Sequence, residues 1–328
     1  MSAERYYSLN GLRVFSMIGI LIMHVLNNLS YCNDLPKTYF VTVKFGELTS
    51  LFMMISAFSV SCGYYEKIKN GGFEEVIKFY KRRYSKILPF FAFLTLIDLV
   101  MHFSFGNFAE SFANITLFFG MIPHEHITVI GVGWTLGVIF VFYLLYPFFV
   151  FLMSNKKLFL VAFLSAALFT FVFNNYFGIG KVDFIYCAIY FFMGCAIYLF
   201  RNDILRYYNR WVVLSGVIIS TIVYYYTELY EIKFVLLTMI LIYAIGLNDN
   251  KTILNNKMMT YLNGISLEIY LCHMFIFRVV ELLDITEISN NLFLSFCITC
   301  VVVFIGTVVF SKGFQFVQKY IRKRLETK

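Results

Sequence analysis

Arg13 and His24 lie eleven residues apart in an otherwise apolar stretch, residues 9–28, with the sequence LNGLRVFSMIGILIMHVLNN. Eleven residues make about three helical turns plus about 20°, so both side chains share one face of a helix. They are then about 16 Å apart along its axis. Asn10 and Asn28 extend this face, one turn before Arg13 and one turn after His24. The spacing predicts a polar stripe along an apolar helix.

Two interpretations of this stripe are open. Ionisable groups inside a bilayer are costly, and they usually face a water-filled cavity or a polar partner. An imidazole has an unperturbed pKa of about 6.5 and is able to take a proton from a hydroxyl group at neutral pH, which makes His24 a candidate general base. In the structural alternative, Arg13 reaches lipid phosphates and His24 hydrogen-bonds a neighbouring helix.

A second group of charges occurs at residues 78–91, where an apolar run begins with KFYKRRYSKILPFF. Arg82 and Arg83 offer planar donors that match pairs of phosphate oxygens, and Lys86 adds a point charge. Without a Walker-type glycine loop a nucleoside triphosphate is not indicated, and a phosphate-bearing carrier such as coenzyme A fits better. The alternative is ordinary anchoring of a basic segment at the cytosolic membrane surface.

Further polar and aromatic residues fall at helical spacing late in the chain and at one central position. Ser266, Tyr270 and His273 recur at i, i+4 and i+7, on one face of a helix. They form either a hydrogen-bonded packing seam or part of a polar cavity. Trp134 follows a GVG run, where it is either an anchor at the membrane interface or an aromatic face on which a sugar stacks.

Three other groups are weaker candidates. The HEH run at 124–126 has metal-binding residue types, but a solvated loop explains it better. The C-x-x-C pair at 297–300 has no second pair or nearby His, so we expect no metal site. All seven cysteines except Cys32 lie in apolar runs, which predicts no disulfide framework. Arg278 and Glu281 have the spacing of an i,i+3 surface ion pair.

The elements that must position these residues are membrane helices. The chain has 328 residues, of which 60% are hydrophobic and 14% are charged, against roughly 25% charged in soluble domains. Apolar runs of about 18 to 25 residues recur throughout, and each is long enough to cross a hydrocarbon core of ~30 Å. The runs predict an all-α integral membrane fold with ten spans, at roughly 10–30, 45–65, 85–105, 128–153, 157–174, 183–200, 211–227, 232–248, 262–282 and 291–312.

The distribution of Lys and Arg supports this count. With the N-terminus in the cytosol, 22 of the 27 basic residues lie on the internal side, as the positive-inside rule requires. Both termini are therefore predicted to be cytoplasmic, with an internal loop near 66–84 and an external segment near 106–127. The net charge of +8 then reflects topology and attraction to anionic lipid or a phosphorylated ligand, and no nucleic-acid partner is expected.

The same features predict a simple domain organisation. No linker-like composition, internal repeat or low-complexity tract divides the chain, so we expect residues 1–328 to form a single membrane domain with no fused soluble domain. The first apolar run is too long for the core of a cleavable signal peptide and lacks a small-residue cleavage pattern.

Five blocks, in order, resemble integral-membrane acyltransferase family 3, which includes bacterial polysaccharide O-acetyltransferases. The family's opening helix, with Arg and His separated by ten residues, is matched by LNGLRVFSMIGILIMH. Its second helix is similar to FMMISAFSVSCGYY and its basic segment to YKRRYSKILPFF. Its Trp-led central helix resembles GWTLGVIFVFYLLYPFF, and its late Ser–Tyr–His helix resembles ISLEIYLCHMFIF.

The resemblance implies a multi-pass O-acetyltransferase of the bacterial cell membrane that uses cytosolic acetyl-CoA as donor and binds no permanent cofactor. It implies His24 as the catalytic residue, assisted by Arg13, and a surface polysaccharide or its lipid-linked precursor as acceptor. Without a fused extracellular transfer domain, the chain would acetylate its acceptor directly or pass the group to a separate extracellular protein. The expected coenzyme-binding residues are Arg82, Arg83, Lys86 and Asn10, and Arg13 is also expected to help hold the coenzyme. The expected acceptor-binding residues are Trp134, Ser266, Tyr270 and His273.

Three positions depart from the family's pattern. Asn10 and Ile139 stand where many members have a carboxylate, and Lys86 stands where the basic motif has its second Arg. Lys86 therefore offers no bidentate phosphate contact.

Two other functions compete with acyl transfer. A polysaccharide flippase or secondary transporter would use the Arg13–His24 stripe as a substrate or proton path, and would favour inverted repeats and broken helices. Neither is detectable in the sequence. A polysaccharide polymerase would carry a large external loop rich in Arg, whereas only five basic residues are predicted to be external.

Overall fold

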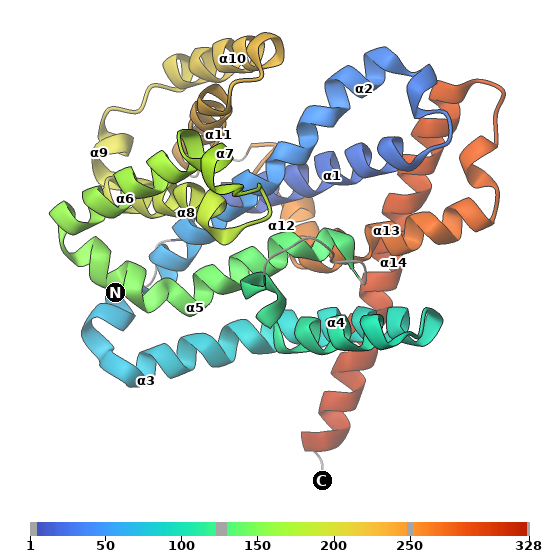
Figure 1. The fold of residues 1–328 in the computed structure, drawn as a ribbon, viewed down its shortest axis with the longest axis horizontal. Coiled ribbons are helices and arrows are strands. Elements are labelled where there is room, and N and C mark those ends of the chain that lie inside the picture. Colours follow the sequence, from blue (N-terminus) through green and yellow to red (C-terminus); the bar gives the residue numbers. More distant parts are fainter. Residues whose placement is uncertain (1–4, 123–129, 248–251, 327–328) are drawn as a thin grey trace. The chain divides into compact units, whose positions relative to one another are not determined.

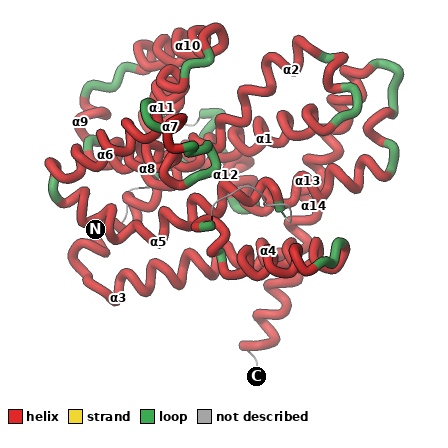
Figure 2. Tube along the Cα trace, in the orientation of Figure 1, coloured by secondary structure: helices red, strands yellow, loops and turns green. Residues whose placement is uncertain are grey.

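The computed structural model describes residues 5–122, 130–247 and 252–326, and all regular structure within them is helical. Figure 2 shows these residues as helices joined by loops and turns. The predicted all-α class is therefore confirmed for the described chain. Contacts within the chain divide it into two compact units. Unit 1 comprises residues 1–9 and 49–255, and unit 2 comprises residues 10–48 and 256–328.

Unit 1 is built from the central part of the chain. Its helices are α3 (Leu48–Met101, which begins at the last residue of unit 2), α4 (Phe105–Thr116), η3 (Phe118–Met121), η4 (Gly131–Gly133), α5 (Trp134–Ser154), α6 (Lys156–Phe171), α7 (Asn174–Phe177), α8 (Phe184–Leu199), α9 (Arg201–Arg206), α10 (Arg210–Thr227) and α11 (Tyr230–Gly246). Its core is aromatic: Phe142 of α5 stacks on Phe191 of α8, with ring centres 4.4 Å apart. Gly194 lets α8 approach α3, because a Cβ there would press on the Met54 carbonyl.

Unit 2 joins an early segment, residues 10–48, to the C-terminal part of the chain, residues 256–328, which Figure 1 draws in blue and in orange to red. Its helices are α1 (Ser8–Asn28), η1 (Cys32–Asp34), α2 (Pro36–Thr42), η2 (Val43–Glu47), α12 (Lys257–Asn263), α13 (Ser266–Leu282), η5 (Ile285–Glu287) and α14 (Leu292–Glu326). Helices α13 and α14 pack together through Glu268, whose carboxylate accepts a hydrogen bond of 2.9 Å from the Gln315 amide.

The segment predicted as an internal loop near 66–84 is instead helical, as part of α3. Gly72 interrupts the helical backbone, with φ 63° and ψ −153°, a conformation open essentially to glycine alone. The flanking residues are rich in Lys and Glu, which are good helix formers. The connection between the second and third predicted spans is therefore helical, and its internal location remains a prediction.

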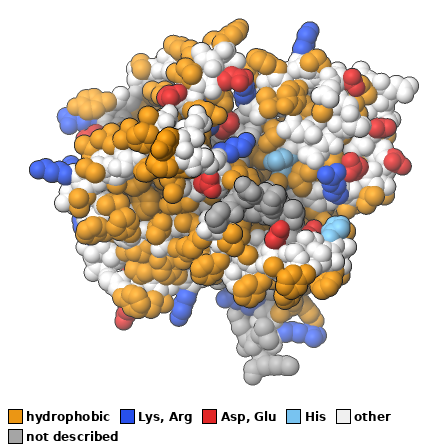
Figure 3. Space-filling model, in the orientation of Figure 1, with side chains coloured by type: hydrophobic (Ala, Val, Ile, Leu, Met, Phe, Trp, Pro, Cys, Tyr) orange, Lys and Arg blue, Asp and Glu red, His pale blue; other side chains and the backbone are white. Residues whose placement is uncertain are grey.

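In the described part of the chain, four helical segments are long and apolar enough to cross a membrane by length and composition: Ser8–Asn28, Pro36–Met101, Gly131–Ser154 and Leu292–Arg324. Each of the ten predicted spans falls on a helix, with the second and third both in α3, while their number and the location of the termini remain predictions. Hydrophobic side chains are widespread on the face drawn in Figure 3, as expected for a surface that meets lipid.

Two exposed phenylalanines provide a test of topology. Phe73 lies in the segment predicted to be internal and Phe112 in the segment predicted to be external, with 76% and 67% of their surfaces exposed. In a variant without the seven native cysteines, a membrane-impermeant maleimide is expected to label Phe112→Cys in intact cells and Phe73→Cys only after permeabilisation. The reverse labelling pattern would contradict the predicted orientation.

Candidate catalytic site

The polar face of α1 begins the site. The helix is continuous from Ser8 to Asn28, so Arg13 and His24 lie on one face, as their spacing predicts. Both side chains are half-buried within an apolar helix. Neighbouring groups therefore decide what each of them is able to do.

His24 faces a second histidine from the other end of the chain. The ring centres of His24 and His273, on α13, are 5.2 Å apart, and the rings are tilted by 44°. His273 is only 1% exposed. The spacing of Ser266, Tyr270 and His273 placed His273 on a face of its helix, and the structure adds that this face meets α1.

The protonation of His273 follows from its contact with the backbone. Its Nδ1 lies 2.6 Å from the Tyr270 carbonyl oxygen, which only accepts hydrogen bonds, so Nδ1 carries the hydrogen. In the neutral ring Nε2 then carries a lone pair. This Nε2 atom is buried and has no hydrogen-bond partner among the residues that the structure describes. The lone pair of His273 Nε2 therefore meets no hydrogen-bond donor among the described residues of unit 2.

The other two members of the predicted seam have structural contacts. The Ser266 hydroxyl donates to the Asn263 carbonyl at 3.1 Å, at the start of α13. Tyr270 is buried, and its ring centre lies 6.0 Å from that of His273. The seam formed by these three residues thus packs α13, while one of its polar atoms, His273 Nε2, makes no hydrogen bond with any described residue.

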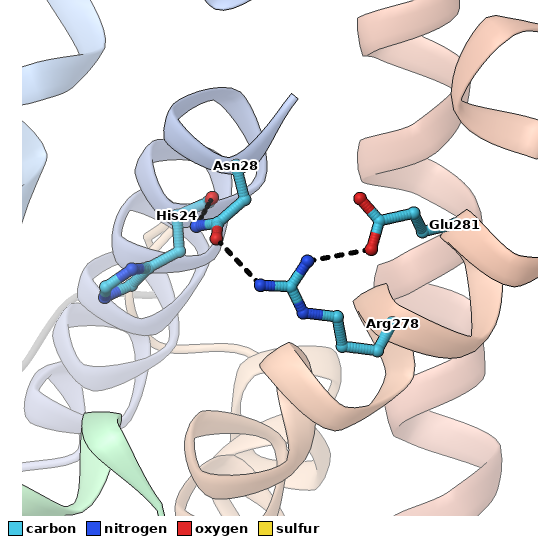
Figure 4. Close-up of polar contacts among 4 residues, drawn as sticks. All are labelled: His24, Asn28, Arg278 and Glu281. Carbon is cyan, nitrogen blue, oxygen red and sulfur yellow. Dashed lines mark hydrogen bonds and ion pairs between the residues drawn. The ribbon is translucent and has the colours of Figure 1, made fainter. Parts of the chain in front are cut away.

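A chain of polar contacts joins the end of α1 to α13, as Figure 4 shows. The Asn28 amide donates to the His24 carbonyl at 2.9 Å, and its oxygen accepts from Arg278 at 3.4 Å. Arg278 also donates to Glu281 at 2.8 Å, which confirms the predicted i,i+3 pair. An exposed pair of this kind contributes about 0–1 kcal/mol to stability. The bond from Arg278 to Asn28 matters for geometry, because it links the last turn of α1 to the helix that carries His273.

Two further contacts fasten the same end of α1. The Tyr31 hydroxyl donates to the Thr286 carbonyl at 2.7 Å, and the Ser30 hydroxyl donates to Glu287 at 3.0 Å. Burial, and secondarily the Glu287 carboxylate, raise the pKa of Tyr31, so its hydroxyl stays protonated and donates. These bonds hold the chain just after His24.

The opposite end of α1 is held by Asn10. Its amide nitrogen lies 3.4 Å from the Thr260 hydroxyl of α12, and the side chain is 5% exposed. Asn10 was predicted to contact the coenzyme, and in this structure it bonds α12. Helix α1 is therefore fixed at both ends within unit 2, which sets the rotation of the helix and the direction of its polar face.

Unit 1 holds the basic segment, on α3. The Arg83 guanidinium carbon lies over three aromatic rings, 4.9 Å from the centre of Tyr143, 5.3 Å from Tyr64 and 5.5 Å from Phe79. Its Nε is buried, and no described residue forms a hydrogen bond with it. Cation–π contacts hold the guanidinium at a set orientation. We call Arg83 and these three rings the Arg83 cage.

The neighbours of Arg83 differ from it in exposure. Arg82 and Lys86 are exposed, whereas Arg83 is half-buried. The residues predicted to bind the coenzyme thus divide between the units, with Asn10 and Arg13 in unit 2 and the basic segment in unit 1. The cage was missed from the sequence, although Phe79 and Arg83 have the i,i+4 spacing of helix neighbours.

The remaining candidates add little chemistry. Trp134, the first residue of α5, is half-buried in unit 1. The HEH run at 124–126 lies outside the described residues. Within the described residues no three His, Cys, Asp or Glu side chains group as metal ligands, and all seven cysteines are free.

A comparison with protein families matches residues 6–312 to the model of acyltransferase family 3, described as an acyltransferase domain. The match includes the polar face of α1, the basic segment of α3 and the whole of α13. Searches of curated proteins and of solved structures find no match to this chain.

Proposed function

Because the chain belongs to acyltransferase family 3, we propose that it transfers an acetyl group from cytosolic acetyl-CoA to a sugar hydroxyl in the bacterial cell membrane. The acceptor is a surface polysaccharide or its lipid-linked precursor. Membership of the family makes the chain a membrane acyltransferase. The acetyl group, the saccharide and the residue roles are our proposal, supported by the chemistry of the two units.

The observation that carries the proposal is the position of His24 beside a buried imidazole. His24 takes the proton of the acceptor hydroxyl while the hydroxyl oxygen attacks the acetyl carbonyl carbon. The C–O ester bond forms, the C–S bond breaks, and the coenzyme sulfur receives the proton from His24. The contacts at both ends of α1 support this role, because a general base must stay within hydrogen-bond reach of the proton it removes.

The donor is proposed to be held by charge. Coenzyme A carries phosphate groups, and a guanidinium offers two parallel donors to phosphate oxygens. Arg83 supports this role best, because its ring contacts hold the guanidinium still and its Nε lacks a partner. Arg82, Lys86 and Arg13 are assigned supporting charges. A separate extracellular protein as the receiver of the acetyl group is kept as a variant of the same reaction.

Mass spectrometry of the host's surface glycans tests the proposal. Deleting the gene is expected to remove one class of acetyl ester, and the wild-type gene is expected to restore it. The purified protein in detergent, given acetyl-CoA and deacetylated glycan, is expected to release coenzyme A and to acetylate the glycan. Unchanged glycans after deletion, without transfer by the purified protein, would contradict the proposed reaction.

A further inference from the structure

We propose that His273 is a positioning residue for His24, an inference that rests on the proposed function of His24 as the base. Its Nε2 accepts a hydrogen bond from the ring nitrogen of His24 that does not face the acceptor hydroxyl. This contact sets the tautomer of His24 and stabilises the imidazolium formed when His24 takes the proton.

The contact between His273 and Tyr270 presets His273 Nε2 as a hydrogen-bond acceptor. Its Nδ1–H donates to the Tyr270 carbonyl three residues earlier in the same helix, at 2.6 Å. Because α13 holds both groups, the contact persists wherever the rest of the chain moves. Nε2 is thereby left as a lone pair. A histidine that served packing alone would need no such fixed tautomer.

No described residue donates a hydrogen bond to the Nε2 lone pair of His273. Nε2 is buried without a hydrogen-bond partner, in a side chain only 1% exposed. Native proteins satisfy most buried polar atoms, so an exception calls for a partner that arrives during function. The N–H of His24 on the nitrogen that faces away from the acceptor hydroxyl is such a partner once the ring turns toward His273, and the positive charge gained on protonation strengthens that hydrogen bond.

The distance between the His24 and His273 rings suits a hydrogen bond between them. An in-line N–H···N bond of about 2.9 Å between two imidazoles places the ring centres about 5 Å apart. The His24 and His273 rings are separated by 5.2 Å. Their tilt of 44° leaves a rotation of the His24 ring about its Cβ–Cγ bond to complete the hydrogen bond. No movement of either helix is required.

The consequence for the reaction is a choice between the two nitrogens of His24. A base must present a lone pair to the hydroxyl, so its other nitrogen carries the hydrogen. Nε2 of His273 accepts that hydrogen and excludes the opposite tautomer. No proton passes to His273, and the proton taken by His24 still leaves with the coenzyme sulfur.

Two substitutions at position 273 separate this role from packing. In His273→Asn the amide nitrogen replaces Nδ1 and keeps a donor for the Tyr270 carbonyl, but no acceptor remains at the position of Nε2. In His273→Gln the amide oxygen replaces Nε2 as acceptor. Hydrogen bonds to charged groups are worth about 10- to 150-fold in an equilibrium. His273→Asn is therefore expected to lower kcat by about that factor with the KM for acetyl-CoA unchanged, and His273→Gln to recover part of the loss.

Histidine-selective ¹⁵N NMR gives a second measurement, because the chain has only five histidines. We expect one wild-type imidazole to remain protonated at Nδ1 across neutral pH, and its signal to be lost in both variants. The His24 signals are expected to shift towards a mixture of tautomers in His273→Asn and to shift less in His273→Gln.

The outcomes separate this inference from the proposed function. If His24→Ala is inactive while His273→Asn keeps the wild-type kcat, the inference is wrong and the role of His24 stands. If both His273 variants lose kcat and thermal stability equally, His273 is structural and the inference is also wrong. If His24→Ala retains full transfer, the proposed function of His24 fails first.

Discussion

Replacing His24 with alanine is expected to lower kcat for acetyl transfer by about 10²- to 10⁴-fold, the usual contribution of a positioned general base. Binding of acetyl-CoA is expected to stay near wild type, because the imidazole acts on the acceptor proton. Stability is expected to change little, since His24 is half-buried and both ends of α1 keep their own hydrogen bonds. Transfer by the purified variant and its thermal melting curve provide the measurements.

His102 supplies the matched control. It directly follows the last residue of α3, but its side chain is 63% exposed and its Nδ1 lies 3.5 Å from Asp98 at the surface of unit 1. His102→Ala is expected to keep wild-type transfer. A His24→Ala protein that melts normally and acetylates the glycan at the wild-type rate would exclude the proposed mechanism.

Replacing Arg83 with alanine is expected to raise the apparent KM for acetyl-CoA by up to about 10- to 150-fold, with a much smaller change in the KM for the acceptor. The range corresponds to one charge-assisted hydrogen bond of roughly 1.5–3 kcal/mol, and the partial exposure of Arg83 lowers it. Arg83→Lys keeps the charge but loses the planar pair of donors and the stacking on the rings, so an intermediate loss is expected.

Arg82 is the matched control for Arg83, because it is the adjacent arginine and is exposed. Arg82→Ala is expected to change the KM for acetyl-CoA by less than about threefold, and Lys86→Ala by a similarly small factor. Loss of the ring contacts costs Arg83→Ala about 0.5–2 kcal/mol of stability, so melting is measured alongside binding. Wild-type acetyl-CoA affinity in a triple variant lacking Arg13, Arg82 and Arg83 would show that the coenzyme is held elsewhere.

The helices were largely predictable, because apolar runs of membrane length favour helix wherever they occur. All ten predicted runs lie on helices, including the two joined in α3. The helical continuity of 66–84 has a physical cause. Charged residues with high helix propensity continue α3 through this segment, and a single glycine, Gly72, interrupts its helical backbone.

The sequence predicted which residues of the site share a face of a helix, but not which faces meet. A period of 3.6 residues placed Arg13 with His24, and Ser266 with His273, but it names no partner for either face. The contact between His24 and His273 depends on tertiary packing, as does the bond from Arg278 to Asn28. Adjacent residues of a helix differ in direction by about 100°, so the choice between Arg82 and Arg83 had to come from the packing of Arg83 against Phe79 and Tyr143.

Unit 2 is formed by residues 10–48 and 256–328, so its two segments are synthesised at different times during translation. Translation delivers His24 among the first residues, yet His273 leaves the ribosome only after the whole of residues 49–255 has been made. Contacts so distant in sequence form late, because a long intervening chain must first be ordered. A nascent chain that has not yet reached α13 therefore carries His24 without His273. The contact between His24 and His273 therefore forms only after α13 has been made, and termination before α13 yields a chain that lacks His273.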